Sequence, residues 1–151
     1  MRFWDWALAA YDRPGVAEAC LALQDDHGQQ TAYLLWAAFA DPEAAALAEG
    51  AALARRWEGE VLAPIRQARR ALKPALPPVG DGERLSLREA VKAAELRAER
   101  LLMETLEGLA GRPAALGGPS GDPSAALTRA GEAWGHPPPP AALHRLASAL
   151  A

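Results

Sequence analysis

The stretch QTAYLLWAAFA, residues 30–40, decides the fold because it is apolar on nearly every face. A helix that is hydrophobic all round is buried inside a protein. Hydrophobic residues make up 50% of the chain, and the commonest of them is alanine, which favours helices over strands. The sequence therefore predicts an all-α protein in which residues 30–40 form the central, most buried helix.

Two shorter helices are predicted before this central one. Residues 3–11 are apolar on most faces, and Asp12-Arg13-Pro14-Gly15 ends that segment with turn-forming residues. An apolar stripe with the helical period then continues to Gly28, through Val16, Ala19, Cys20, Leu23 and His27. Pro14 suits the first turn of this second helix, which should therefore run from about Pro14 to Gly28 and turn the stripe inward.

Two longer helices are predicted after the central one. Asp41-Pro42 has the pattern of an N-cap followed by proline in the first turn, and an apolar stripe runs from there to Lys73. Pro64 removes a backbone donor within this stretch, so we expect a kink or a junction between two helices there. Ser86-Leu87-Arg88-Glu89 is a capping box, which predicts that the last long helix begins there and ends near Gly108.

The C-terminal part of the chain has a different composition. Gly111 to Pro123 is rich in glycine and proline, and residues 137–140 are four consecutive prolines, which is typical of linkers. We therefore expect a compact bundle of about five helices in a domain of residues 1–110. A Pro/Gly-rich linker and a weakly helical, loosely packed tail should follow over residues 111–151.

Composition also indicates a compartment. The single cysteine, Cys20, excludes an intramolecular disulfide and a cysteine-based zinc site, and a reducing environment fits best. The first residues do not have the pattern of a signal peptide, and no run approaches the ~18 apolar residues of a membrane span. We expect a cytoplasmic protein with no membrane span.

The sequence lacks the common catalytic and cofactor motifs. It contains no phosphate-binding loop, no dinucleotide glycine fingerprint and no His-Glu-x-x-His pair. The serines lie at a predicted helix cap or in the tail, where a nucleophile has no plausible partners. We therefore predict no cofactor and no metal, and we favour a function other than catalysis.

A polar cluster at the end of the second predicted helix is one candidate site. It contains Gln24, Asp25 and His27, next to Asp26. Carboxylates in the last turn of a helix interact unfavourably with the helix dipole unless a cation pairs with them. The cluster could be an acid–base pair or half of a metal site, but His136 and His144 lie in the tail, so a ligand set is incomplete. The structural interpretation, a helix C-cap with a hydrogen-bonded core histidine, is favoured.

A basic helix face is the second candidate site. Arg66, Arg69, Arg70 and Lys73 are spaced i, i+3, i+4 and i+7, so they share one side of a helix, and Trp57 precedes them on the apolar stripe. Three interpretations stay open. The face could be solvated, it could pair with Asp25 and Asp26 inside the fold, or it could bind an external anionic or protein partner. The tryptophans, Trp57 among them, could either fill the core or line a pocket.

Four stretches of the chain together resemble a known family. These are residues 4–11 (WDWALAAY), 13–28 (RPGVAEACLALQDDHG), 34–36 (LLW) and 57–73 (WEGEVLAPIRQARRALK). They resemble a small family of conserved hypothetical proteobacterial proteins catalogued as domain of unknown function 2390. The resemblance spans roughly residues 4–109 and implies no activity.

These observations lead to one preferred function and one alternative. We expect a non-enzymatic helical protein-interaction or adaptor module that presents a basic and apolar surface near Pro64 to a protein partner. The alternative is a protein that binds a small ligand or an anion, possibly an enzyme that uses His27 and Asp25. Nucleic-acid binding is disfavoured because the net charge is −3 and no aromatic residues are interleaved with the basic run. The oligomeric state stays open.

Overall fold

The computed structural model describes residues 1–111 and 122–151, and these residues form helices and loops without a strand. The fold is therefore all-α, as the sequence predicts. In chain order the elements are α1 (Phe3–Tyr11), α2 (Val16–His27), α3 (Thr31–Ala40), α4 (Ala44–Trp57), the π-helical turn η1 (Glu58–Leu62), α5 (Ala63–Ala71), α6 (Asp81–Leu109), α7 (Pro123–Trp134) and α8 (Pro140–Leu150). None of these helices combines the length and the hydropathy that crossing a membrane requires.

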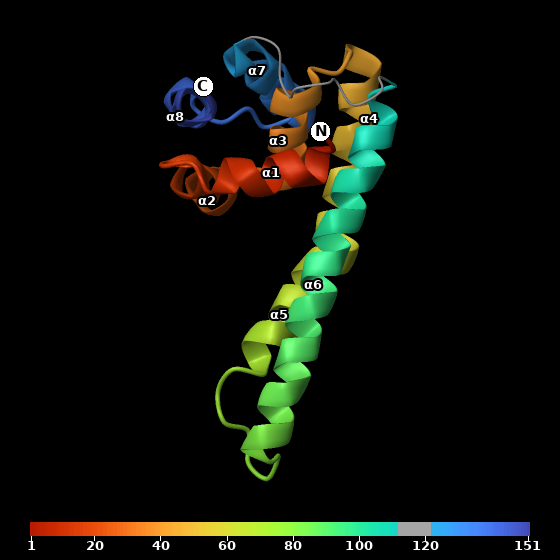
Figure 1. The fold of residues 1–151 in the computed structure, drawn as a ribbon, viewed down its shortest axis with the longest axis vertical. Coiled ribbons are helices and arrows are strands. Elements are labelled where there is room, and N and C mark those ends of the chain that lie inside the picture. The colour runs from red at the N-terminus through yellow and green to blue at the C-terminus, as the bar shows by residue number, and fades with distance from the viewer. Residues whose placement is uncertain (112–121) are drawn as a thin grey trace.

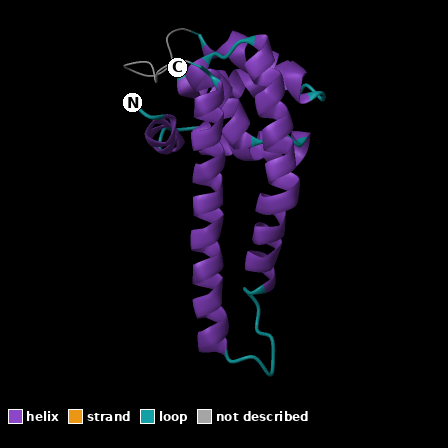
Figure 2. Cartoon of the chain, turned by 90° about the vertical axis from the view of Figure 1, so that its right-hand side faces the viewer, coloured by secondary structure: helices purple, strands orange, loops and turns teal. Residues whose placement is uncertain are grey.

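The molecule consists of a helical head and a projecting arm. Figure 1 shows α5 and the N-terminal half of α6 running side by side away from the other helices, and Figure 2 shows the same hairpin from the side. We define the arm as residues 63–97 and the head as the other described residues. Every residue of the arm is described, and none belongs to the buried hydrophobic core, which skips from Leu62 to Ala98. The arm therefore adds no buried residue to the core of the head, and only its root, at Ile65, packs against that core.

The central helix α3 is the middle of the head. Nine of its ten residues are buried, from Thr31 to Phe39, which confirms the prediction for this stretch. The helix lies against α6 on one side and α7 on another. Its Phe39 ring packs 5.4 Å from Phe3 and 5.3 Å from Trp6, both in α1. The aromatic residues of the first helix thus bury their rings on the central one.

The expectation of a loosely packed C-terminal tail is wrong. Helix α7 packs against α3 and α4, and α8 packs against α2. Trp134 is buried, its ring lies 5.5 Å from that of Tyr33, and its indole N–H donates to the Gly28 carbonyl at 3.1 Å. The Pro/Gly-rich composition indicated a linker before these helices, but it did not reveal that α7 and α8 each carry an apolar face. Most of the predicted linker falls on residues 112–121, which lie outside the described residues.

Two predicted helix starts are also wrong. Helix α4 begins at Ala44, and Asp41 instead caps the C-terminus of α3 with a φ of 42°. Helix α6 begins at Asp81, five residues before the capping box at Ser86. Asp81 and Glu83 lie in its first turn, where acidic side chains interact favourably with the helix dipole. This earlier start lengthens the arm.

The interruption predicted at Pro64 is confirmed. Helix α4 passes into η1, and α5 then begins with the proline in its first turn. The Ala63 N–H donates to the Glu58 carbonyl five residues back, which is the π-helical pattern. Such turns are frequent at functional sites, and here the turn marks the root of the arm.

Candidate functional site

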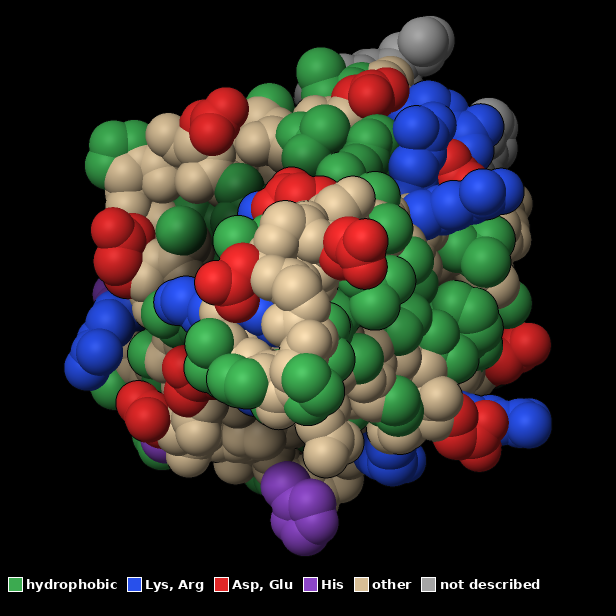
Figure 3. Space-filling view, turned by 90° about the horizontal axis from the view of Figure 1, so that it is seen from below, with side chains coloured by type: hydrophobic (Ala, Val, Ile, Leu, Met, Phe, Trp, Pro, Cys, Tyr) green, Lys and Arg blue, Asp and Glu red, His purple; other side chains and the backbone are tan. Residues whose placement is uncertain are grey.

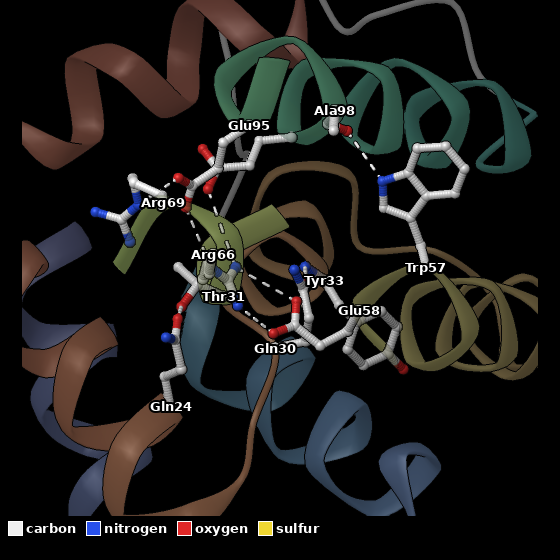
Figure 4. Close-up of polar contacts among 11 residues, drawn as sticks. Gln24, Gln30, Thr31, Tyr33, Trp57, Glu58, Arg66, Arg69, Glu95 and Ala98 are labelled. Carbon is white, nitrogen blue, oxygen red and sulfur yellow. Dashed lines mark hydrogen bonds and ion pairs between the residues drawn. The ribbon is translucent and has the colours of Figure 1, made fainter. Parts of the chain in front are cut away.

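Two arginines at the root of the arm form an ion-pair network with three glutamates. Arg66 is in contact with Glu58 of η1, and its Nε lies 3.4 Å from Oε1 of Glu95. The Arg66 Nη2 lies 4.0 Å from Oε1 of Glu99, and Arg69 Nε lies 2.7 Å from Oε2 of Glu95. Figure 4 shows Arg66 and Arg69 reaching from α5 to carboxylates on both sides. Three carboxylates face two guanidinium groups, so the network has a formal net charge of −1.

The sequence spacing explains why these side chains meet. Glu95 and Glu99 are one turn apart on α6, and Arg66 and Arg69 are about one turn apart on α5. Because the two helices run side by side as a hairpin, the two pairs face each other. Burial raises the pKa of Glu99, and the nearby Glu95 carboxylate raises it further. Glu99 is therefore the carboxylate in the network whose charge is least compensated.

The predicted basic face is thus divided between two environments. The Arg66 and Arg69 side chains are only 15% and 27% exposed, whereas Arg70 and Lys73 are exposed. The interpretation of a fully solvated face is therefore wrong for Arg66 and Arg69. Internal pairing occurs, but with Glu58, Glu95 and Glu99 in place of Asp25 and Asp26, both of which are exposed at the end of α2. The sequence signal for the correct partners was the i, i+4 pair of glutamates on α6.

Trp57 also serves an internal contact. It is half-buried at the C-terminus of α4, and its indole N–H donates to the Ala98 carbonyl at 3.0 Å. This bond, drawn as a dashed line in Figure 4, ties α4 to α6 at Ala98, the first residue of α6 beyond the arm. Of the five candidate residues predicted for the surface near Pro64, Arg70 and Lys73 are therefore the two that are exposed.

The polar cluster of α2 is only partly brought together. Gln24 is half-buried, and its Oε1 accepts a hydrogen bond from the Thr31 hydroxyl at 3.4 Å. Asp25 is exposed, and His27 is half-buried in the last turn before Gly28, which caps the helix with a φ of 62°. Within the described residues, no side-chain hydrogen bond joins these three candidates. Gln24 alone faces the space between the head and the arm.

Sequence reasoning missed a buried amide next to this cluster. Gln29 is 3% exposed, and its Nε2 donates to the carbonyls of His27 at 3.2 Å and His136 at 2.8 Å. These bonds tie the end of α2 to the segment that follows α7. A glutamine beside a helix C-cap gave no signal for this role, because its partner lies 107 residues away.

The far end of the arm exposes apolar side chains. Of the nine exposed large hydrophobic residues in the described part of the chain, five lie in the arm: Leu76, Val79, Leu85, Leu87 and Leu96. We define the arm tip as Leu76, Val79, Leu85 and Leu87. In Figure 3, a view from the side of the tip, hydrophobic side chains are interspersed with charged ones. Among residues 1–111 and 122–151, no element covers the apolar side chains of the tip.

A buried arginine orders the loop of the tip. Arg84 is 6% exposed and donates through Nη1 to the carbonyls of Leu72 and Lys73, both at 2.7 Å. Its Nη2 lies 3.1 Å from Oδ1 of Asp81. A charged group that satisfies the end of α5 in this way fixes the loop against α6. The exposed apolar side chains are therefore presented on a preformed surface.

A helical head that carries an ordered two-helix arm is the class of protein that this fold and these sites define. The chain belongs to the family described as protein of unknown function (DUF2390), whose model matches residues 2–106. This finding confirms the resemblance seen in the sequence. The matched range includes the whole arm and the network at its root, and it ends before α7. Comparisons with curated proteins and with solved structures gave no match.

Proposed function

We propose that this protein is a helical interaction module that binds a partner protein through its arm tip. The observation that supports the proposal most strongly is the concentration of exposed large apolar side chains on an arm that adds no residue to the buried core. Ordering a residue costs about 1–2 kcal/mol of backbone entropy, and core burial is the usual compensation. Contiguous exposed apolar patches mark interaction sites in soluble proteins, and we take the four residues of the arm tip as one such patch with charged residues around it.

The charge of the arm indicates the chemistry of the partner. Residues 67–92 carry six basic and three acidic side chains, a net charge of +3 in a chain whose net charge is −3. Arg70 and Lys73 of this segment are exposed. A partner that places carboxylates around an apolar centre would complement both features. The proposed partner is therefore a protein with an acidic and apolar surface.

A second copy of the chain fits this surface less well. Two arm tips packed on each other would bring together segments that each have a net charge of +3, and like charges across an interface are unfavourable. An arm tip packed on the acidic head of another copy would be a heterologous contact, which closes only if the rotation allows it. The proposal therefore assigns the tip to a different protein.

Site-specific photo-cross-linking tests the proposal. A photoreactive amino acid is placed at Leu87 in the tip, and a matched control is placed at Leu21 on α2; these side chains are 54% and 58% exposed. In cells that express the protein naturally, we expect the Leu87 probe to capture a protein that the Leu21 probe does not capture. The captured protein is then purified, and its affinity for the unmodified chain is measured.

The affinity measurement decides the outcome. We expect binding that weakens with salt, that falls at least about tenfold in the double variant Leu76→Ser, Leu87→Ser, and that is unchanged in Leu21→Ser. Three results would contradict the proposal. These are equal capture by both probes, capture of a second copy of the chain only, and an affinity that the tip substitutions leave unchanged.

A further inference from the structure

A cavity lies where the arm joins the head, separate from the tip. It has a volume of about 490 Å³ and is lined by residues of α1, α2, α3, α5 and α6. Small-molecule sites in proteins typically measure about 300–1,000 Å³ and combine apolar walls with a few polar groups. The cavity meets both criteria.

The apolar walls come mainly from the head. Ala7, Ala32 and Met103 are buried there, and Trp4 and Leu96 lie closer to the opening. Alanine leaves room beside a large ring, which is how an alanine-rich bundle can hold a cavity next to its tryptophans. Trp4 lines this cavity. For this tryptophan the structure thus supports the pocket, one of the two interpretations that the sequence left open.

The polar groups of the cavity converge from four elements. Gln24, Gln30 and Thr31 come from the end of α2 and the start of α3, and Tyr11 from the end of α1. Across from them, α6 contributes Glu99. Amide and hydroxyl groups of this kind orient a bound molecule through hydrogen bonds, whereas a charged group selects its charge.

The charges around the cavity select against an anion. Arg66 is the one cationic side chain among the described lining residues, and Glu58 and Glu95 already pair with it. The lining also contains two carboxylates, Asp12 and Glu99. Glu99 lies 4.0 Å from Arg66, at the limit of an ion pair. The lining therefore has an excess of negative charge, and Glu99 is the carboxylate with most need of a cation.

We infer that this cavity binds an organic amine, with the protonated nitrogen at Glu99 and the apolar body against the walls formed by α1, α3 and α6. The Tyr11 ring at the same cavity is suited to a cation, because aromatic faces attract positive charge, whereas the Trp4 ring already has the Arg100 guanidinium 5.6 Å from its centroid. Gln24 and Thr31 can accept or donate further hydrogen bonds to a polar substituent. This site is independent of the arm tip, so the two proposals succeed or fail separately.

Three isosteric probes test the inference. Phenethylamine, phenylethanol and phenylpropanoate share a ring and a chain but are cationic, neutral and anionic at neutral pH. Binding to the full chain is measured by calorimetry, and the site is located by backbone amide shifts in NMR spectra. Tryptamine and hexylamine extend the set to a larger and a more flexible amine. We expect the amines to bind at least about tenfold more tightly than phenylethanol, and to shift the amides of the cavity residues.

Variants assign the effect to the cavity. Glu99→Gln keeps the shape of the side chain and should remove the preference for amines. The matched control Glu89→Gln lies on the same helix, is exposed and pairs with Lys92 outside the cavity, so it should bind like the unmodified chain. Leu96→Trp enlarges a side chain that is 54% exposed at the opening, and it should weaken binding without affecting the core.

Any of four results would overturn the inference. The first is phenylpropanoate binding as tightly as phenethylamine, which would make Arg66 the dominant charge. The second is equal binding of amine and alcohol. The third is no binding of any of the three amines at millimolar concentration. The fourth is an amine preference that persists in folded Glu99→Gln.

Discussion

Arg69 Nε lies 2.7 Å from Oε2 of Glu95, and this ion pair joins the two helices of the arm. The other oxygen of the same carboxylate lies 3.4 Å from Arg66 Nε. One glutamate of α6 thus holds two arginines of α5. Because the Glu95 side chain is only 13% exposed, water screens these interactions less than it screens a surface pair. The network fixes the direction in which the arm leaves the head.

Replacing Arg66 should destabilise the protein. Arg66→Met keeps most of the side-chain volume but leaves Glu58, Glu95 and Glu99 close together with one guanidinium fewer. We expect a loss of about 2–3 kcal/mol in the free energy of unfolding, measured by urea denaturation. The control is Arg70→Met on the same helix, which is exposed and should change stability by no more than about 0.5 kcal/mol. Equal effects of the two substitutions would show that the network does not hold the arm.

The helices could be predicted from the sequence because their signals are local. The 3.6-residue period located α1 and α3 to within a residue, Pro14 placed the start of α2 two residues too early, and Pro64 marked the junction between α4 and α5. The ion-pair network could not be predicted in the same way. Its arginines lie about 30 residues from Glu95 and Glu99, and only the hairpin between them determines that these charges meet. The local spacing suggested Asp25 and Asp26 as possible partners, whereas in the fold Arg66 and Arg69 pair with Glu58, Glu95 and Glu99.

Trp134 should be essential for the fold. The Trp134 ring packs on Tyr33, and its indole N–H donates to the Gly28 carbonyl. The backbone carbonyl of Trp134 accepts a hydrogen bond from Arg55. Trp134→Ala would leave a cavity and an unpaired Gly28 carbonyl, so we expect a loss of about 3–5 kcal/mol in the free energy of unfolding. Trp57→Ala, at a half-buried tryptophan, should cost less. A melting temperature unchanged by Trp134→Ala would support the loosely packed tail that the composition suggested.

The C-terminal helices show where composition misleads. Prolines before a segment reduce the flexibility of the connection, but they do not determine whether the next helix finds a partner. In α8 the buried residues Leu143, Leu146, Ala147 and Leu150 follow the helical period and cover α2. The periodic pattern was therefore present in the sequence, and the neighbouring Pro/Gly-rich stretches obscured its meaning.

The ionised Glu99 side chain should lower the free energy of unfolding at neutral pH. Burial and Glu95 raise its pKa, so the folded state binds the proton of Glu99 more tightly than the unfolded state does. Its contribution to stability is therefore fully present below the unfolded pKa and is lost as the pH rises through the folded pKa. We expect Glu99→Gln to be at least as stable as the unmodified chain at neutral pH, and to lose any advantage at acid pH. Urea denaturation at both pH values measures this. A Glu99→Gln variant that is less stable than the unmodified chain at neutral pH would contradict it.

The arm can be shortened without touching the core. Removing residues 71–92 and joining α5 to α6 through a short Gly-Ser turn deletes the tip and Arg84 but keeps Arg69 and Glu95. No residue of the buried hydrophobic core lies in the deleted segment, which the structure describes in full. We expect the free energy of unfolding to stay within about 1 kcal/mol of the full chain, because a shorter connection costs little. Loss of the cooperative transition would show that the arm is structural.

The dissociation constant of the partner captured at Leu87, measured with this shortened chain, tests the central claim most directly. The shortened chain keeps the head, the ion-pair network and the cavity, and it lacks only the surface to which binding is assigned. We predict that the partner binds the full chain and no longer binds the shortened one at any concentration that saturates the full chain. An unchanged dissociation constant would contradict the claim, because it would place the binding surface on the head.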